Sequence, residues 1–270
     1  MNTDNVKQLC EEALRRLATA LEQGQSDALK TYLATLARFR KYSWGNVLLI
    51  FTQKPNASHV AGFQTWRKLN RSVRKGEKGI AIFAPMIVKK RNGAEESEDE
   101  QTHLYGFRTA YVFDESQTDG EPLPSFATVK GDPKQFTADL ETLIGERGIT
   151  LEYTDRIAPA KGMSSGGRIE VLPGLPPAEQ FSVLVHETAH ELIHKGERRK
   201  NTSKTVRETE AEAVAFVVCH SIGLDTNTAA SDYIRLYQGD QATLAESLEV
   251  IQKTSAEILR AIAPAPDPLQ

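Results

Sequence analysis

The sequence predicts an α+β protein with two domains. Long stretches with apolar residues at helical spacing are interspersed with shorter, β-rich segments. Residues 118–133 are rich in Asp, Gly, Pro, Ser and Thr, which is typical of a linker. A chain of 270 residues is long enough for two domains. We therefore expect one domain at residues 1–119, a linker at 120–131, a second domain at 132–263 and a disordered tail at 264–270.

The composition is that of a soluble globular protein, with 40% hydrophobic and 26% charged residues. Its formal net charge of −3 does not indicate a nucleic-acid partner for the chain as a whole. The two cysteines, Cys10 and Cys219, are far apart, which argues against a disulfide framework and fits a reducing compartment. The N-terminus lacks an apolar signal segment, and no apolar run is long enough to span a bilayer. These features predict a cytoplasmic protein with no membrane partner.

The first half of the chain is predicted to contain helices followed by a β-hairpin. Apolar residues recur at helical spacing from Asp4 until Gly24 ends the pattern. The expected elements are helices over 4–22 and 28–39, a short apolar helix ending at 51, and strands over 80–83, 86–88 and 104–113. Pro85 is expected to break the first strand of the hairpin. The strongly acidic residues 92–101 are interpreted as its disordered tip.

The second half is predicted to contain three long helices after a pair of strands. Pro177 suits the first turn of a helix and Gly223 suits the residue after one. The expected elements are helices over 133–144, 177–194, 205–223 and 244–262, strands over 148–153 and 168–172, a turn over 162–167 and a basic loop over 196–204. The glycines of the 162–167 turn would leave room for a peptide beside the 168–172 strand, although an ordinary tight turn explains them equally well.

The segment from Lys30 to Arg91 is strongly basic, with fourteen Lys and Arg residues and a single acidic residue, Glu77. Such a local imbalance is an electrostatic signature for binding phosphate. Aromatic residues are interleaved with the cations, as in proteins that hold single strands by stacking bases on rings. The candidate DNA-binding residues are Arg40, Lys41, Tyr42, Trp44, Asn46, Trp66, Arg67, Lys68, Arg74, Lys75 and Lys78. We also expect at least one of Trp44, Phe63 and Trp66 to be a core residue.

A second motif lies within the helix predicted over 177–194. The string His186-Glu187-Thr188-Ala189-His190 is an H-E-x-x-H pattern in an otherwise apolar segment. Two histidines four residues apart lie on the same face of a helix, where both imidazoles can reach one metal ion. Glu187 would then lie beside the open coordination position and act as a general base.

A zinc site of this kind needs a third protein ligand. The next predicted helix carries Glu208 and Glu212, which are four residues apart and share a face, whereas Glu210 points elsewhere. We assign Glu208 as the ligand and Glu212 as the carboxylate that binds the outer nitrogen of a liganding histidine. The opposite assignment of the two glutamates remains open. Zn²⁺ is the expected ion, with Mn²⁺, Co²⁺ or Ni²⁺ as substitutes.

Other polar residues have less certain roles. His194 continues the histidine stripe by one turn, and it could be a ligand, orient substrate or cap the helix near Gly196. An oxyanion would need a hydrogen-bond donor. The sequence does not choose among the candidates, which are His194, His220, Tyr233 and Tyr237.

These motifs resemble those of a known family. The H-E-x-x-H string, followed by Arg-Glu208-x-Glu-Ala-Glu212-Ala-x-Ala-Phe, resembles the zinc-peptidase domain of the ImmA/IrrE group and of ArdC-type antirestriction proteins. Residues 42–46 (Tyr-Ser-Trp-Gly-Asn), 62–66 (Gly-Phe-Gln-Thr-Trp) and 73–79 (Val-Arg-Lys-Gly-Glu-Lys-Gly) resemble the N-terminal, single-stranded-DNA-binding domain of ArdC-type proteins. The acidic insertion at 92–101 departs from that pattern. The resemblance implies a DNA-binding domain followed by a zincin-like metallopeptidase domain.

Two functions follow as expectations. The first is a zinc metalloendopeptidase that binds single-stranded DNA and hydrolyses peptide bonds of a protein substrate of unknown identity, with DNA directing or activating cleavage. The second is a non-proteolytic antirestriction protein that coats incoming single-stranded DNA, with a structural or vestigial metal site. The resemblance implies this second role on mobile genetic elements.

Overall fold

The computed structural model describes residues 2–23, 25–89, 102–121, 133–224 and 241–263. The described part of the chain is rich in both helices and strands, which confirms the predicted α+β class. Its contacts divide it into two compact units. Apart from the last two residues, unit 1 comprises residues 1–13 and 48–123, and unit 2 comprises residues 14–47 and 124–268.

This division differs from the expected boundary at 119, because residues 14–47 group with the C-terminal half. Helix α2 (Ser26–Arg38) packs on α8 (Lys204–Ser221) of unit 2. Its apolar stripe is buried, with Leu33 and Leu36 each 1% exposed. Helical spacing identified the buried face of α2, but it carries no information about which element covers that face.

Unit 1 is built on an antiparallel sheet with the strand order β1-β4-β3. The strands are β1 (Val60–Gly62), β3 (Ile80–Lys89) and β4 (Thr102–Asp114), and β2 (Arg71–Val73) pairs separately with β5 (Thr118–Gly120). The expected hairpin is confirmed, but β3 runs through Pro85 without a break. β3 is an end strand of this sheet, where a missing N–H can be tolerated.

Two short helices complete the core of unit 1. The core of unit 1 includes Ile80, Ile82 and Val112 from the strands, all at most 6% exposed. Helix α3 (Trp44–Gln53) contributes Leu48, Leu49 and Ile50, and α4 (Phe63–Lys68) contributes Trp66. The side-chain amide of Gln53 donates to the Ala81 carbonyl at 2.8 Å and accepts from the Ala81 N–H at 3.0 Å. These two bonds fix α3 to the backbone of β3.

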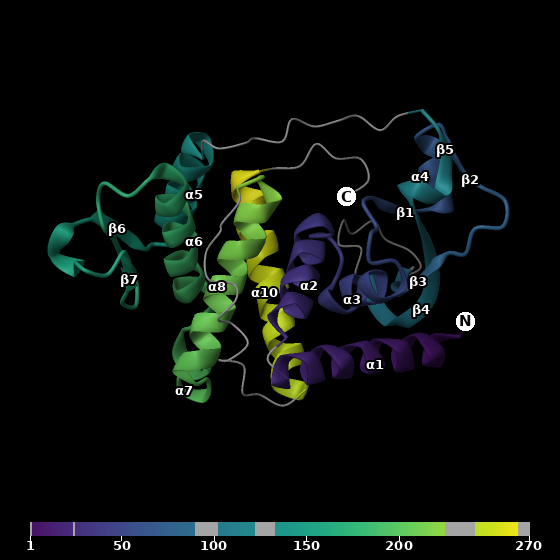
Figure 1. Ribbon diagram of the computed structural model, residues 1–270, viewed down its shortest axis with the longest axis horizontal. Helices are drawn as coiled ribbons and strands as arrows, with labels where there is room; N and C mark the ends of the chain where they lie inside the picture. Colours follow the sequence, from purple (N-terminus) through teal and green to yellow (C-terminus); the bar gives the residue numbers. More distant parts are fainter. Residues whose placement is uncertain (1, 24, 90–101, 122–132, 225–240, 264–270) are drawn as a thin grey trace, which may run out of the picture. The chain divides into compact units, whose positions relative to one another are not determined.

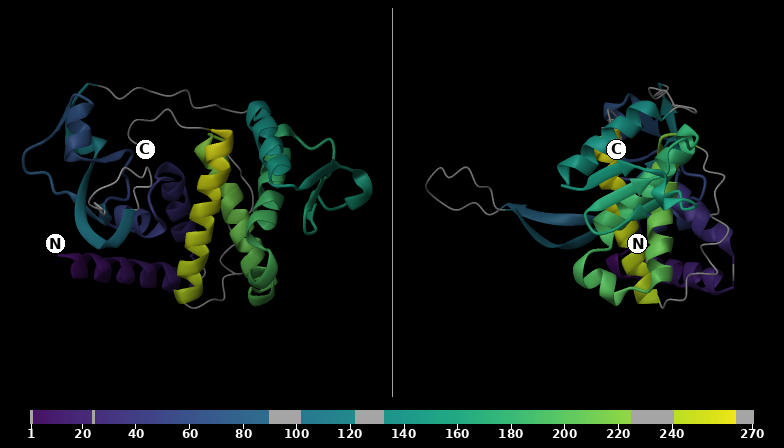
Figure 2. Two further views of the ribbon diagram at one scale, coloured as in Figure 1. Left: turned by 180° about the vertical axis from the view of Figure 1, so that it is seen from behind. Right: turned by 90° about the vertical axis from the view of Figure 1, so that its left-hand side faces the viewer.

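Unit 2 combines a small mixed sheet with a helical layer (Figures 1 and 2). In the order β6-β8-β7, β6 (Thr150–Tyr153) is parallel to β8 (Arg168–Val171), and β7 (Gly162–Ser164) is antiparallel to it. Helix α1 (Thr3–Glu22) belongs to unit 2 from Leu14 onward. The other described helices of this unit are α2, α5 (Lys134–Glu146), α6 (Pro177–Ile193), α7 (Gly196–Asn201), α8 and α10 (Gln241–Ile262). Helix α6 lies between the sheet and α8, and α8 also packs against α10.

The long helices of unit 2 agree with the predicted ranges to within three residues at each end. The predictions for two segments were wrong. Residues 162–164, expected in a turn, form strand β7, and the turn itself lies at Gly166 and Gly167, whose φ angles are +64° and +93°. Residues 196–201, expected in a loop, form the short helix α7. Both segments are too short for a periodic signal to show in the sequence.

Several expectations fall outside the described residues. They concern the acidic tip at 92–101, the tail at 264–270 and most of the 120–131 linker. Strand β5 occupies the start of the Asp- and Gly-rich stretch from which the linker was inferred. Within the described residues, no helix combines the length and the hydropathy that crossing a membrane requires.

Candidate metal centre

The H-E-x-x-H string lies in the middle of α6, as predicted. Pro177 occupies the first turn of this helix, where a missing N–H does no harm. Buried apolar residues hold α6 in the core, with Phe181, Leu184 and Val185 before the motif at 0% exposed and Ile193 after it at 8%. The one-turn spacing brings Nε2 of His186 and Nε2 of His190 to 3.1 Å from each other.

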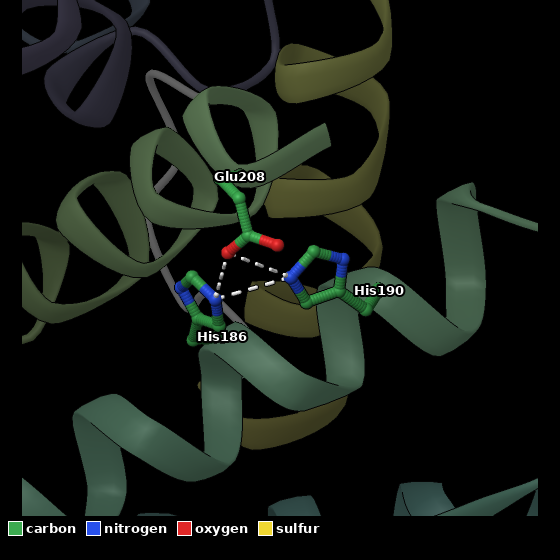
Figure 3. Close-up of side chains that lie close together, drawn as sticks. All are labelled: His186, His190 and Glu208. Carbon is green, nitrogen blue, oxygen red and sulfur yellow. Dashed lines mark hydrogen bonds and ion pairs between the residues drawn. The ribbon is translucent and has the colours of Figure 1, made fainter. Parts of the chain in front are cut away.

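Helix α8 brings a carboxylate to the same point (Figure 3). Oε2 of Glu208 lies 3.6 Å from Nε2 of His186 and 3.6 Å from Nε2 of His190. The three ligand atoms lie within 4.8 Å of one another and could hold a metal ion. The structure therefore brings together the residues that the sequence suggested as ligands.

Glu212 lies one turn further along α8 and contacts the other side of His186. Its Oε2 is 3.1 Å from Nδ1 of His186. A proton on Nδ1 leaves Nε2 of the same ring as a lone-pair donor that faces Glu208. This geometry favours Glu208 over Glu212 as the third ligand.

The electrostatics of the cluster favour positive charge between these carboxylates. Hydrogen bonds to His186 and His190 hold the pKa of Glu208 well below its usual range, against the opposing effect of burial. Burial lowers the pKa of His186, but hydrogen bonds to Glu208 and Glu212 outweigh it and raise this pKa to about 9. A cation between these groups would satisfy the same negative field.

Glu187 is 8% exposed and lies beside strand β7. Burial raises the pKa of its carboxyl, and the charges of His186 and His190 oppose this rise. The close approach of β7 depends on Gly162, because a Cβ there would come within 2.7 Å of Oε1 of Glu187. Glu191, on the next turn of α6, accepts the N–H groups of Gly166 and Gly167 at 2.9 and 2.6 Å. Helix α6 therefore positions the turn between β7 and β8.

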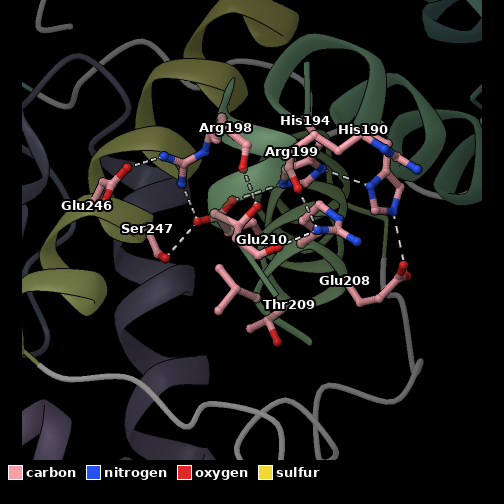
Figure 4. A network of polar contacts seen from close by, with 12 residues as sticks. His190, His194, Arg198, Arg199, Glu208, Thr209, Glu210, Glu246 and Ser247 are labelled. Atoms are coloured by element: carbon pink, nitrogen blue, oxygen red, sulfur yellow. Dashed lines mark hydrogen bonds and ion pairs between the residues drawn. The ribbon is translucent and has the colours of Figure 1, made fainter. Parts of the chain in front are cut away.

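A buried polar network supports His190 (Figure 4). Its Nδ1 lies 2.8 Å from Nδ1 of His194, and Nε2 of His194 lies 3.0 Å from Oε2 of Glu210. The other oxygen of Glu210 accepts from Arg198 at 2.6 Å and from Ser247 at 2.7 Å. Hydrogen bonds from His194 and Ser247 keep the pKa of Glu210 low despite its burial.

The roles of Glu210 and Arg198 were not predicted from the sequence. His194 was visible as the third member of an i, i+4 stripe, and among its suggested roles the structure favours the helix cap, since it is the C-cap residue of α6. It is 3% exposed and fully engaged in this network, so it is not a candidate for contacting substrate. Glu210 does point away from Glu208, as the helical wheel predicted, but it points into the core.

The other candidates for binding an oxyanion are two tyrosines and His220. Tyr233 and Tyr237 lie outside the described residues. His220 is exposed near the end of α8, where its ring stacks on Phe216 with centroids 5.6 Å apart.

Five of the candidate DNA-binding residues lie in unit 2. Arg40 and Lys41 follow α2 and line an open pocket of about 430 Å³ together with Gln252 and Arg260 of α10. The other three side chains are too buried for DNA to contact them over their whole length. Tyr42 and Trp44 are half-buried, and Asn46 is 8% exposed.

The other candidates lie in unit 1, and Trp66 is not available for DNA. It is 0% exposed, and its Nε1 donates to the Phe113 carbonyl at 2.9 Å. Trp66 is thus a core residue, which meets the expectation that at least one aromatic of this segment would be buried. Its assignment as a DNA contact was wrong, because the sequence does not show which face of a six-residue helix packs inward.

The basic candidates of unit 1 divide into two kinds. Arg67, Lys68, Lys75 and Lys78 are exposed. Arg74 instead bonds Glu77 at 3.0 Å and Asp119 at 3.2 Å, so it holds the turn after β2 together. Its charge is therefore partly neutralised within the protein.

Comparison with known proteins identifies the N-terminal part. Residues 7–113 match the family described as the N-terminal domain of anti-restriction factor ArdC. The protein carries an ArdC N-terminal domain. The fold extends this likeness to the rest of the chain, because the metal-free crystal structure of antirestriction protein ArdC from plasmid R388 matches with a TM-score of 0.58 and 18% identity. That match covers 96% of this chain and 99% of the R388 chain. The sequence match is thus to the ArdC N-terminal domain, and the fold of the chain as a whole resembles that of ArdC from R388.

Two further matches extend the comparison. The Mn(II)-bound structure of the same R388 protein matches with a TM-score of 0.55 and 19% identity, over 94% of this chain and 98% of that one. An uncharacterized protein of Bacillus anthracis is 25% identical over 242 residues. That alignment covers 74% of this chain and 41% of the relative, so the chain spans less than half of the relative's length.

Proposed function

We propose that this ArdC-type protein is a single-stranded-DNA-binding, metal-dependent peptidase. The observation that carries the proposal is the convergence of His186, His190 and Glu208 on one point, with the buried carboxylate of Glu187 beside them. Two histidines and a glutamate are the protein ligands of one common class of catalytic zinc site. A site with three protein ligands keeps a further position for water or substrate.

The residues present fit a metal ion on two grounds. Both imidazoles turn Nε2 toward Glu208, while each Nδ1 has its own partner, Glu212 or His194. Such outer partners are typical of metal-binding histidines. Zn²⁺ is the ion we expect, and the R388 relative is described with bound Mn(II), which the same donor set can accept. Co²⁺ and Ni²⁺ are further substitutes.

His186, His190 and Glu208 would hold the ion, which when bound acidifies a water and polarises the scissile carbonyl. Glu187 accepts the proton of the attacking water and passes it to the leaving amine. Its raised pKa suits a group that must both accept and release a proton. The partners of both Nδ1 atoms orient the two rings so that each Nε2 faces Glu208.

Strand β7 supplies a place for the substrate backbone. It is an end strand of the β6-β8-β7 sheet and lies against α6 next to Glu187. An extended peptide that pairs with this edge would pass Glu187 with its own backbone polar groups satisfied. Recognition through the backbone predicts activity on a loosely folded protein segment rather than on a compact domain.

The DNA-binding part of the proposal rests on the ArdC N-terminal match and on the exposed cations of unit 1. Arg67, Lys68, Lys75 and Lys78 all face solvent. Contacts of this kind release counterions, so affinity for single-stranded DNA should fall steeply with salt. Absence of binding at low salt would contradict this part of the proposal.

The test is proteolysis by the metal-loaded full chain, with and without single-stranded DNA. Self-cleavage and cleavage of a loosely folded test protein are read on gels. Glu187→Gln is the matched variant, because it keeps the shape and the metal ligands and loses the base. Cleavage should disappear in this variant while its metal content stays at the wild-type level. Equal cleavage by both proteins would rule out the mechanism.

The ArdC N-terminal match also favours a second function, in which the protein protects incoming DNA by binding it and no proteolysis is needed. The two functions predict different effects of the same substitutions on DNA protection. Protection by binding should survive Glu187→Gln and be lost when Lys75 and Lys78 are both changed to Gln. Protection that depends on proteolysis should be lost in Glu187→Gln.

A further inference from the structure

The β3–β4 hairpin of unit 1 carries exposed aromatic side chains on one of its faces. Phe107 and Tyr111 of β4 are separated by an even number of residues and lie on the same face, opposite to the buried Val112. They are 53% and 44% exposed. Phe83 of β3 joins them, with its ring centroid 6.4 Å from that of Phe107. Phe83, Phe107 and Tyr111 together form the aromatic strip.

The strip continues toward the hairpin end with Tyr105. The register of β3 and β4 shifts by one residue between Met86 and Ile87, and Tyr105 is the extra residue of this bulge. It is 81% exposed, more than the other large apolar or aromatic residues of the described chain. Exposed aromatic surface gathered on one hairpin in this way is typical of a binding site.

The aromatic strip adjoins a cationic turn. Gly79 packs directly on Tyr111, since a Cβ at residue 79 would lie 2.9 Å from Cβ of Tyr111. Lys78 therefore stands next to one end of the strip, and Lys75 lies in the same turn. The side-chain amide of Gln117 fixes this turn by donating to the Lys78 carbonyl at 2.9 Å.

The charges of this turn favour an anionic partner. Lys75 and Lys78 are exposed, and neither forms an ion pair with another residue that the structure describes. The acidic residue of the turn, Glu77, is already bonded to Arg74 at 3.0 Å and to Gln117 at 3.0 Å. The positive charge beside the strip is therefore not balanced locally.

We propose that the aromatic strip, extended by Tyr105, stacks the bases of single-stranded DNA while Lys75 and Lys78 hold its phosphates. This inference rests on the proposed DNA binding and assigns it a surface. Rings beside a cationic groove are how single strands are bound without sequence reading. Phe107 and Tyr111 are about 13 Å apart along the strand, from the rise per residue, which leaves room for more than one base. A duplex hides its base faces, so it cannot use the strip.

The experiment measures binding of a labelled oligothymidine to the full-length protein as a function of salt. Phe107→Leu and Tyr111→Leu should each weaken binding about 5- to 100-fold, which is the range for losing one stacked base. Tyr111→Phe keeps the ring and should bind as the wild type does. Tyr153→Leu removes an exposed aromatic side chain of unit 2 and is the matched control.

Salt dependence separates stacking from phosphate contacts. Aromatic variants should bind more weakly with an unchanged slope of log affinity against log salt. Lys75→Gln and Lys78→Gln should each reduce the slope by about 0.7, the value for one single-strand phosphate contact. An oligomer of abasic sites should bind the wild type and Phe107→Leu equally, because it has no bases to stack.

The outcomes distinguish this inference from the proposed function. If the wild type binds the oligothymidine and the leucine variants bind as tightly, the strip is not the platform, although DNA binding stands. If the wild type does not bind even at low salt, both proposals fail. If the leucine variants change the oligomeric state and leave DNA affinity unchanged, the strip joins two copies of the chain and the inference is overturned.

Discussion

Nδ1 of His190 lies 2.8 Å from Nδ1 of His194, so one predicted metal ligand is tied to a second histidine one turn along the same helix. His194 is tied in turn to Glu210, which is 1% exposed. The other predicted ligand histidine, His186, has a different partner, the half-buried Glu212. The two predicted ligand histidines are therefore oriented by separate carboxylates of α8, one directly and one through an intervening imidazole.

This arrangement predicts that Glu210 controls metal affinity without touching the metal. Glu210→Gln should weaken metal binding about 10- to 100-fold, because His194 and then His190 lose their fixed orientation. Competition with a chromophoric chelator measures the affinity. Glu246→Gln is the control, since Glu246 also bonds Arg198 but its side chain is 63% exposed. Equal affinities for the wild type and Glu210→Gln would show that His190 needs no support from this network.

Removal of the metal should lower the stability of the protein. A ligand at 100 times its Kd stabilises the folded state by about 2.7 kcal/mol, provided that it does not bind the unfolded chain. Adding a chelator should therefore lower the midpoint of thermal unfolding in the wild type. His186→Ala should unfold at the same temperature with and without chelator. A chelator effect of equal size in this variant would place the stabilising ion elsewhere.

Gly162 is predicted to be essential for the position of Glu187. In Gly162→Ala the new methyl group would meet Val183 at 2.6 Å and Glu187 at 2.7 Å, so either β7 or the carboxylate must move. We expect the proposed peptidase activity to fall at least tenfold with metal content unchanged, and stability to fall by about 1–3 kcal/mol. Gly145→Ala is the control, because nothing lies within 4 Å of a Cβ there and the site is helical. That variant should keep its activity and gain a few tenths of a kcal/mol or more.

A substitution at Trp66 tests whether this residue stabilises the core or contacts DNA. Trp66→Phe leaves the Phe113 carbonyl without its 2.9 Å donor and removes buried ring volume. Urea unfolding should show a loss of about 1–3 kcal/mol, the range for a buried acceptor left without its partner. Affinity for single-stranded DNA should change less than twofold in the folded protein. A large loss of affinity with unchanged stability would restore Trp66 to the DNA surface.

Asp114 should make unit 1 sensitive to acid. It is 1% exposed and accepts the backbone N–H groups of Ser58, His59 and Ser116 at 2.7, 3.2 and 3.0 Å. Burial alone would raise the pKa of this carboxyl, but hydrogen bonds from Ser116, Ser58 and His59 outweigh it and lower the pKa.

A folded-state pKa below the unfolded value means that Asp114 contributes stability above the unfolded pKa, about 3.9. This contribution is lost as the pH falls through the folded-state pKa. Asp114→Asn should therefore destabilise the protein at pH 7 by about 1–3 kcal/mol, and the difference from the wild type should shrink below pH 4. Urea unfolding at a series of pH values measures both. A difference that is independent of pH would show that the charge of Asp114 is unimportant.

Much of the candidate site was predictable because it depends on spacing within single helices. The interval from His186 to His190 places both rings on one face of α6, and the interval from Glu208 to Glu212 does the same on α8. The helices themselves follow from apolar periodicity, and their ends from Pro177 and Gly223. These are local properties, and 3.6 residues per turn converts them directly into geometry.

The tertiary structure decided which residues these helices meet. Glu210 and Glu212 are the same residue type on the same helix, yet their partners differ. Glu210 is buried against Arg198 and Ser247, whereas Glu212 contacts His186. Trp66 became a core residue, and residues 14–47 joined the C-terminal unit. The aromatic strip depends on the pairing of β3 with β4 and on the burial of the opposite face of this hairpin. Burial depends on contacts between segments distant in the sequence, and a pattern within one segment shows a buried face but not the partner that covers it.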